Sequence, residues 1–128
     1  MNNVVDSSGW LEYFAEGGNA DFFVPPIQDT ENLIIPSICL YEVFKRALPQ
    51  VGEDEALRVA GVMSLGQVVE LNRDLALDAA QVSIMQKLAL ADSVILATTQ
   101  LYNATLWTQD EHFKELEGVK YIAKRPTV

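Results

Sequence analysis

The sequence is poor in cysteine and histidine. Cys39 is the single cysteine and His112 the single histidine among 128 residues. A lone thiol excludes an internal disulfide and favours a reducing compartment, so we expect a cytoplasmic protein. A zinc site built from several cysteine and histidine ligands is excluded for the same reason. With no histidine near it in sequence, Cys39 is expected to be a packed residue rather than a nucleophile.

Positive charge is also scarce, with 9 basic residues against 18 acidic ones and a net charge of −9. This balance excludes a broad basic face for non-specific nucleic-acid binding, although binding through metal ions stays open and a basic protein partner is favoured. No apolar run is long enough to cross a bilayer, and Met1–Asp6 lacks the basic and apolar regions of a signal peptide. We therefore expect no membrane association.

Short apolar segments alternate with helical ones along the chain. Strands are expected at residues 3–6, 33–36, 67–71, 104–107 and 119–122, the last at an edge. This order predicts an α/β fold with a central parallel sheet of about five strands, covered by helices on both faces as three layers. The length fits a single domain over residues 1–128, with a loose C-terminal tail at about 123–128.

Apolar periodicity predicts the buried faces of the helices. The helix after Ser37 is expected to end at Pro49 and Gly52. A short helix is expected around Pro25 and Pro26. The helix before residue 110 is apolar on most sides and is therefore expected inside the molecule. The side chains expected to be buried are Leu40, Phe44, Ala47 and Leu48, then Leu57, Ala60, Met63 and Leu65, then Leu77, Ala80, Ile84 and Leu88.

Four acidic residues occupy related positions in this scheme. Asp6 ends the first strand, Glu42 lies early in the helix after the second, and Asp110 follows the fourth. Because the carboxyl ends of parallel strands lie at one edge of a sheet, these three are expected to converge. Asp92 opens the helix before the fourth strand, and joins them only if the N-terminus of that helix is docked near the same edge.

Converging carboxylates require compensation. Two unit charges about 4 Å apart repel by roughly 4 kcal/mol at an effective dielectric constant of 20. Either some of the acids are protonated or a cation lies between them. Oxygen ligands without cysteine or histidine clusters indicate Mg²⁺ or Mn²⁺. Two such ions roughly 3.5–4 Å apart activate water and stabilise the leaving oxygen in phosphodiester cleavage.

Each acid also has a local structural interpretation. Asp6 could cap the first helix, and Asp92 its own. Asp110 could cap a short helix over Glu111–Leu116, and Glu42 could pair with Arg46 at i,i+4. The arrangement of all four acids, rather than any one of them, favours a functional site.

Four motifs resemble the PIN-domain family, and within it the toxins of VapBC toxin–antitoxin modules. The resemblance extends from Val4 to about Ile122. The motifs are Val4-Val5-Asp6-Ser7-Ser8, then Ile35-Pro36-Ser37-Ile38 leading to Tyr41-Glu42, then residues 90–98 around Asp92, and residues 104–113 around Asp110. Two positions depart from the usual pattern: Gln109 stands where a basic residue is frequent, and Ala89 where proline is frequent.

The resemblance implies a Mg²⁺- or Mn²⁺-dependent endoribonuclease in which metal-activated water is held by four carboxylates. It implies a homodimer neutralised by a VapB-like antitoxin, which can place a basic side chain among the acids. Asp6, Glu42, Asp92 and Asp110 are then the catalytic residues and metal ligands. Ser7 and Thr108 support them, Thr108 by holding Asp110 or a water molecule. Lys45 and Arg46 are candidate contacts to RNA phosphates, or else an exposed charged face.

Three alternative functions fit the sequence less well than a nuclease does. A haloacid-dehalogenase-like phosphatase needs an aspartate where Ser8 stands, and a receiver-type phosphoacceptor needs one directly after the third strand, where Asn72-Arg73-Asp74 fits poorly. Loss of one acid would favour a non-catalytic PIN-like binding module, yet all four are present. His112 is expected to face solvent, because the helical phase turns it away from the acids.

Overall fold

The structure is a computed structural model and describes residues 1–126 of the chain. Five strands form one all-parallel sheet in the order β3-β2-β1-β4-β5. The expected number of strands, their parallel pairing and the edge position of the last strand are confirmed. The strands are β1 (Asn3–Val5), β2 (Leu33–Pro36), β3 (Gln67–Val69), β4 (Thr105–Thr108) and β5 (Val119–Tyr121).

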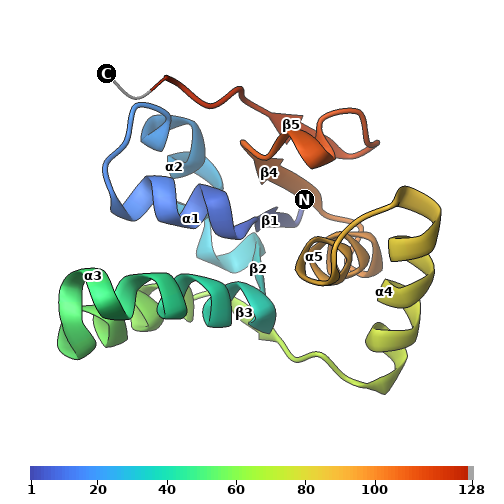
Figure 1. Cartoon of the computed structure of the whole chain (residues 1–128), viewed down its shortest axis with the longest axis horizontal. Helices are drawn as coiled ribbons and strands as arrows, with labels where there is room; N and C mark the ends of the chain where they lie inside the picture. Colours follow the sequence, from blue (N-terminus) through green and yellow to red (C-terminus); the bar gives the residue numbers. More distant parts are fainter. Residues whose placement is uncertain (127–128) are drawn as a thin grey trace.

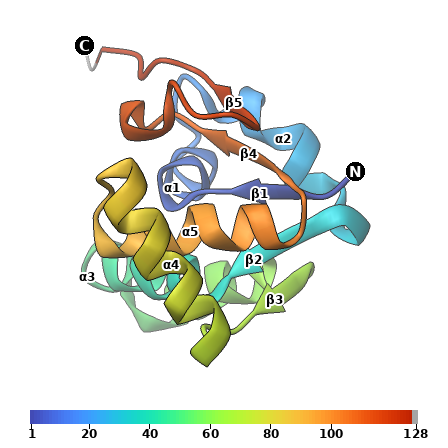
Figure 2. The same ribbon diagram turned by 90° about the vertical axis from the view of Figure 1, so that its right-hand side faces the viewer.

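Helices cover both faces of this sheet, so the expected three-layer α/β/α architecture is confirmed (Figures 1 and 2). One face carries α1 (Ser7–Phe14), α2 (Ala20–Gln28) and α3 (Ser37–Met63). The other carries α4 (Arg73–Gln86) and α5 (Leu90–Leu101). Two short 3₁₀ turns, η1 (Thr30–Asn32) and η2 (Glu111–Phe113), precede β2 and follow β4.

Helix α5 lies at the centre of the molecule. Residues 93–99 are all buried, including the polar Thr98 and Thr99. Their hydroxyls donate to the carbonyls one turn earlier, Val94 O and Ile95 O, at 2.8 Å each, so burial leaves no unpaired group there. The expectation of an internal helix is confirmed, and its N-terminus is anchored at the edge of the sheet where β1 and β4 end.

Several expected helix faces were wrong, but the expected break near Gly52 is confirmed. The range Ser37–Met63 of α3 consists of two helical segments, separated at Gly52, whose φ of 84° and ψ of 172° are not helical. This φ lies in the region that favours glycine. The side chains that α3 buries are Cys39, Val43, Ala56, Val59 and Met63, whereas Leu48, Leu57 and Leu65 are exposed. The alternative apolar faces lie one residue apart, about 100° around the helix, and docking against β2 and α5 decides between them.

The expected buried face of α4 was also wrong. Leu75 and Ala79 are buried, whereas Leu77 and Ile84 are 62% and 81% exposed. Helix α4 contacts the rest of the chain mainly through α5, so it buries one side only. Apolar side chains from α4 and the start of α5 therefore remain open to solvent.

The C-terminal segment is held more firmly than expected. Residues 123–126 form no helix or strand, but Asn19 Nδ2 donates to Ala123 O at 3.0 Å, and Arg125 Nε donates to Asn19 Oδ1 at 3.2 Å. The end of the expected tail, residues 127–128, lies outside the described residues. Among residues 1–126 no single helix is long and apolar enough to span a membrane; α4 and α5 reach that length and composition only as a pair bent by 111°.

Candidate metal centre

Asp6 directly follows β1 and caps α1. Its Oδ1 accepts hydrogen bonds from Gly9 N at 2.9 Å and Ser8 Oγ at 2.8 Å, and its Oδ2 accepts one from Thr108 Oγ1 at 2.6 Å. The side chain is only 2% exposed. Burial raises the pKa of Asp6 from 3.8 to about 6, even though these three hydrogen bonds act to lower it. The fold thus keeps a carboxylate in a place where ionisation is costly.

Thr108 joins Asp6 to the loop that carries Asp110. It is the last residue of β4, which pairs with β1 so that Val5 lies opposite Trp107. Its buried hydroxyl donates to Asp6 and accepts from Asp110 N at 2.9 Å. We expected Thr108 to hold Asp110 or a water molecule. In the structure it contacts the Asp110 main chain and the Asp6 side chain.

Glu42 reaches the same place from α3, on the second turn of that helix. Ser7 Oγ donates to Glu42 Oε1 at 2.6 Å, so the first residue of α1 fixes the carboxylate of a neighbouring helix. The alternative pairing with Arg46 is not among the ion pairs that residues 1–126 form. The hydroxyl contact orients Glu42 without neutralising it.

Asp92 lies in the first turn of α5 and does not cap it, because the N-cap is Ala89. The capping interpretation of Asp92 is therefore wrong, whereas Asp6 caps α1 and Asp110 caps η2. The pKa of Asp92 is raised, first by partial burial and then by the negative charges of Asp110 and Glu42.

One cavity of about 450 Å³ brings the four acids together. Asp6, Glu42, Asp92 and Asp110 all line it, and the cationic side chains along its wall are Arg46 and Lys124. The concentration of carboxylate oxygens suits a hard divalent cation such as Mg²⁺ or Mn²⁺. A tighter group within the described chain consists of Asp92, Asp110 and His112, one ligand atom of each lying within 4.8 Å of the others. Asp6 and Glu42 stand outside that group.

The sequence matches the PIN domain over residues 4–119. The chain belongs to the PIN-domain family. No curated protein matches it.

Solved structures with the same fold include chains of toxin–antitoxin systems. A toxin–antitoxin complex from Klebsiella pneumoniae is similar with a TM-score of 0.80 and 22% identity, over 93% of this chain and 96% of that one. VapC20 of Mycobacterium tuberculosis, described as a sarcin–ricin-loop-cleaving toxin, has a TM-score of 0.74 and 15% identity, over 98% of this chain and 100% of that one. VapBC2 from Rickettsia felis, bound to promoter DNA, has a TM-score of 0.72 and 12% identity, over 96% of this chain and 98% of that one. At these identities the likeness concerns the fold.

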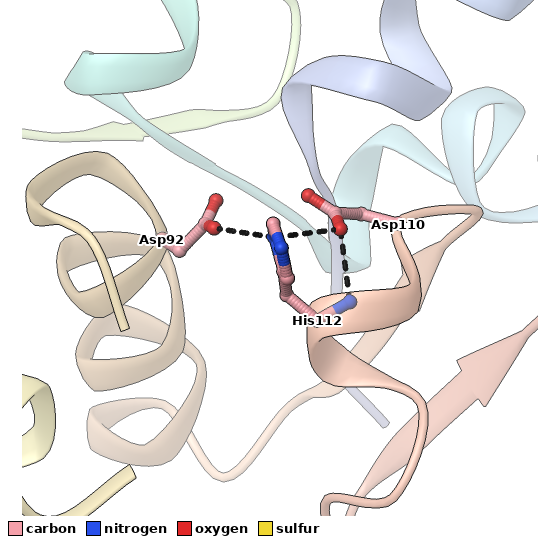
Figure 3. Close-up of side chains that lie close together, drawn as sticks. All are labelled: Asp92, Asp110 and His112. Carbon is pink, nitrogen blue, oxygen red and sulfur yellow. Dashed lines mark hydrogen bonds and ion pairs between the residues drawn. The ribbon is translucent and has the colours of Figure 1, made fainter. Parts of the chain in front are cut away.

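The expected orientation of His112 in this PIN domain was wrong. The imidazole is exposed, as expected, but it lies between two acids instead of pointing away from them (Figure 3). The expected helix over Glu111–Leu116 is a single 3₁₀ turn that ends at Phe113. In this turn His112 N donates to Asp110 Oδ1 at 2.9 Å, which brings residue 112 back beside its capping acid.

Three basic residues of this PIN domain lie at or beside the acidic cavity. Arg46 lines the acidic cavity, whereas Lys45 lies over the ring of Tyr41, 5.5 Å from its centroid, in an adjoining depression. Lys124 also lines the acidic cavity, and sequence reasoning missed it by assigning it to a tail. The only sequence signal for Lys124 was its positive charge near the end of an acidic chain.

Gln109 has a structural role in this fold. It is buried, accepts a hydrogen bond from Asn19 Nδ2 at 2.9 Å, and donates to Ser8 O at 3.4 Å. Through these contacts the loop after β4 is fixed to α1 and to the start of α2. Cys39 is fully buried, as expected for a packed residue, and burial raises the pKa of its thiol far above the ordinary value.

Proposed function

We propose that this PIN domain is a divalent-metal-dependent endoribonuclease, with Asp6, Glu42, Asp92 and Asp110 as its catalytic and metal-binding residues. The observation that carries the proposal is the convergence of these acids, from four separate segments, on one cavity. A bound cation of the Mg²⁺ or Mn²⁺ type supplies Lewis-acid charge for water activation and for the phosphate. Without a cation, the mutual repulsion of the acids opposes their ionisation.

The protein's own residues have distinct tasks in this proposal. Ser7 and Thr108 hold Glu42 and Asp6 in fixed rotamers, which preserves ligand geometry between turnovers. Arg46 and Lys124 at the cavity wall neutralise the RNA phosphates nearest the cleaved bond. Lys45 and the exposed Tyr41 stand next to Arg46 and extend the path of the strand.

We further infer that the nuclease is the toxin of a toxin–antitoxin pair. Support comes from the fold shared with chains of VapBC and other toxin–antitoxin complexes. VapC20, one of the proteins with this fold, is described as cleaving the sarcin–ricin loop, so an RNA target is the natural candidate. A VapB-like antitoxin with a basic side chain in the acidic cavity would displace the cation by charge. We expect both partners, and the RNA, in the cytoplasm.

We also infer a homodimer. In α4, Leu77 and Ile84 were expected to be buried but are 62% and 81% exposed. Leu90 at the start of α5 is 74% exposed. Ile84 and Leu90, together with Leu71 and several alanines, line a largely apolar groove of about 410 Å³. Exposed apolar surface of this kind is typical of an interface, and a second copy would bury it.

The decisive experiment compares Asp92→Asn with Asp74→Asn. Both aspartates lie in the first turn of a helix, but Asp74 is at the exposed start of α4, away from the cavity. We expect the wild type and Asp74→Asn to cleave RNA in Mg²⁺ or Mn²⁺, to be inactive in EDTA and to arrest growth when expressed alone. Asp92→Asn should do none of these. Cleavage by Asp92→Asn at the wild-type rate, or cleavage in EDTA, would contradict the proposal and favour a non-catalytic PIN module or contamination.

A further inference from the structure

The imidazole of His112 faces two of the proposed metal ligands. Its Nδ1 lies 3.1 Å from Asp110 Oδ1 and 3.6 Å from Asp92 Oδ2, and Figure 3 shows the ring between the two carboxylates. The two acids come from different elements, Asp92 from α5 and Asp110 from the loop before η2. A nitrogen atom therefore completes a three-sided group in which the other two atoms are oxygens.

The main chain holds His112 in this position. Asp110 caps η2 by accepting from His112 N, so the Asp-x-His segment forms a closed turn with both side chains on the same side. The side chain is 69% exposed, and the polar contacts of its ring are those with the two carboxylates.

The spacing of the three atoms fits a shared cation. Ligand atoms about 2.1 Å from an octahedral ion lie about 3.0 Å apart when adjacent and about 4.2 Å apart when opposite. The 3.1 Å between His112 Nδ1 and Asp110 Oδ1 matches adjacent ligands, and the 3.6 Å between His112 Nδ1 and Asp92 Oδ2 lies between the adjacent and opposite separations. All three ligand atoms lie within 4.8 Å of one another. Small rotations of exposed or half-exposed side chains are enough to close the remaining difference.

We propose that His112 Nδ1 is a ligand of the divalent cation held by Asp92 and Asp110, and that it makes the site prefer a transition-metal ion to Mg²⁺. This inference rests on the proposed function. Mg²⁺ is held almost entirely by oxygen, whereas imidazole binds ions of the Mn²⁺-to-Zn²⁺ series increasingly well. The ring is neutral as a ligand, so it fills a coordination position without adding to the negative charge of the cavity.

Pulsed electron paramagnetic resonance of bound Mn²⁺ tests this directly. The protein is prepared without a polyhistidine tag, so that the single histidine of the chain is the only possible source of an imidazole ¹⁴N coupling. The wild type should show this coupling, and His112→Gln should lose it while still binding Mn²⁺ through the carboxylates. The matched control is Glu111→Gln, a change at the exposed neighbouring residue, which should retain the coupling.

Metal titrations separate the selectivity claim from the nuclease claim. His112→Gln should weaken Mn²⁺ binding by about tenfold or more, and Mg²⁺ binding by about threefold at most. Equal weakening of both ions would overturn the selectivity. A wild-type spectrum without nitrogen coupling, with Mn²⁺ binding still lost in Asp92→Asn, would overturn ligation by His112 and leave the nuclease intact. Mn²⁺ binding that neither substitution weakens would overturn the metal centre and the proposed function together.

Discussion

Asp6→Asn provides a quantitative test of the buried carboxylate, independent of catalysis. Asp6 is 2% exposed, and burial raises its pKa to about 6 from the ordinary value of 3.8. A carboxyl group whose pKa is raised in the folded state binds a proton on folding. Its contribution to stability is therefore fully present below pH 3.8 and is lost as the pH rises through 6. At about 1.4 kcal/mol per pH unit, ionised Asp6 costs the fold about 3 kcal/mol at neutral pH.

The expected result follows from these two pKa values. In EDTA, lowering the pH from 7.5 to 5 should raise the free energy of unfolding of the wild type by about 1.4 kcal/mol relative to Asp6→Asn, since the amide cannot titrate. Urea denaturation at several pH values between 5 and 7.5 measures both proteins under identical conditions. The other titratable groups, including Asp92 with its raised pKa, are present in both proteins, so the difference between them isolates Asp6.

Repeating the denaturation with a divalent cation in place of EDTA tests whether the cation binds to ionised Asp6. Saturating Mg²⁺ or Mn²⁺ should stabilise the wild type most at neutral pH, where Asp6 is ionised, and so reduce its dependence on pH. A stability difference between wild type and Asp6→Asn that stays constant from pH 5 to 7.5 would refute the reasoning. A difference of the opposite sign would do so too, because it would mean that Asp6 is stabilised as an anion.

Three further perturbations test the supports of the site. Ser7→Ala removes the donor to Glu42, and we expect cation affinity to fall by roughly tenfold with an unchanged melting temperature, measured by calorimetric titration. Arg46→Gln should weaken RNA binding and lower the slope of log affinity against log salt by about 1, measured by fluorescence anisotropy with inactive protein; an unchanged slope would remove Arg46 from the RNA path. Ile84→Asp should turn the proposed dimer into a folded monomer in analytical ultracentrifugation, whereas Asp78→Asn on the same helix should leave that dimer intact.

The sheet could be predicted from the sequence because its signals are local. The run Leu33–Pro36 reads as a buried strand, and all four residues are buried in β2. The acids Asp6 and Asp110 could be placed beyond the ends of their strands for the same reason, since chain direction fixes which edge they reach. That Asp92 reaches this edge could not be derived locally, because it depends on how α5 docks.

The errors arose where the local pattern allowed two solutions. Helix α4 has apolar residues on more than one side, and tertiary contact with α5 selects Leu75 and Ala79 instead of Leu77 and Ile84. His112 was misplaced because a single 3₁₀ turn has no helical phase to extrapolate. There, the hydrogen bond between the backbone and Asp110 determines where residue 112 points.

The hydroxyl of Thr108 also has a consequence for the pairing of the two central strands. Sliding β4 by one residue against β1 would put Trp107 or Gln109 where Thr108 now stands, and would leave Asp6 buried without its strongest donor. A misaligned pair of strands is thus destabilised for two reasons: its apolar side chains are displaced from the core, and the buried Asp6 carboxylate loses a hydrogen bond. The hydrogen bond between Thr108 and Asp6 therefore favours the native alignment of β1 and β4 as well as the position of the proposed metal ligand Asp6.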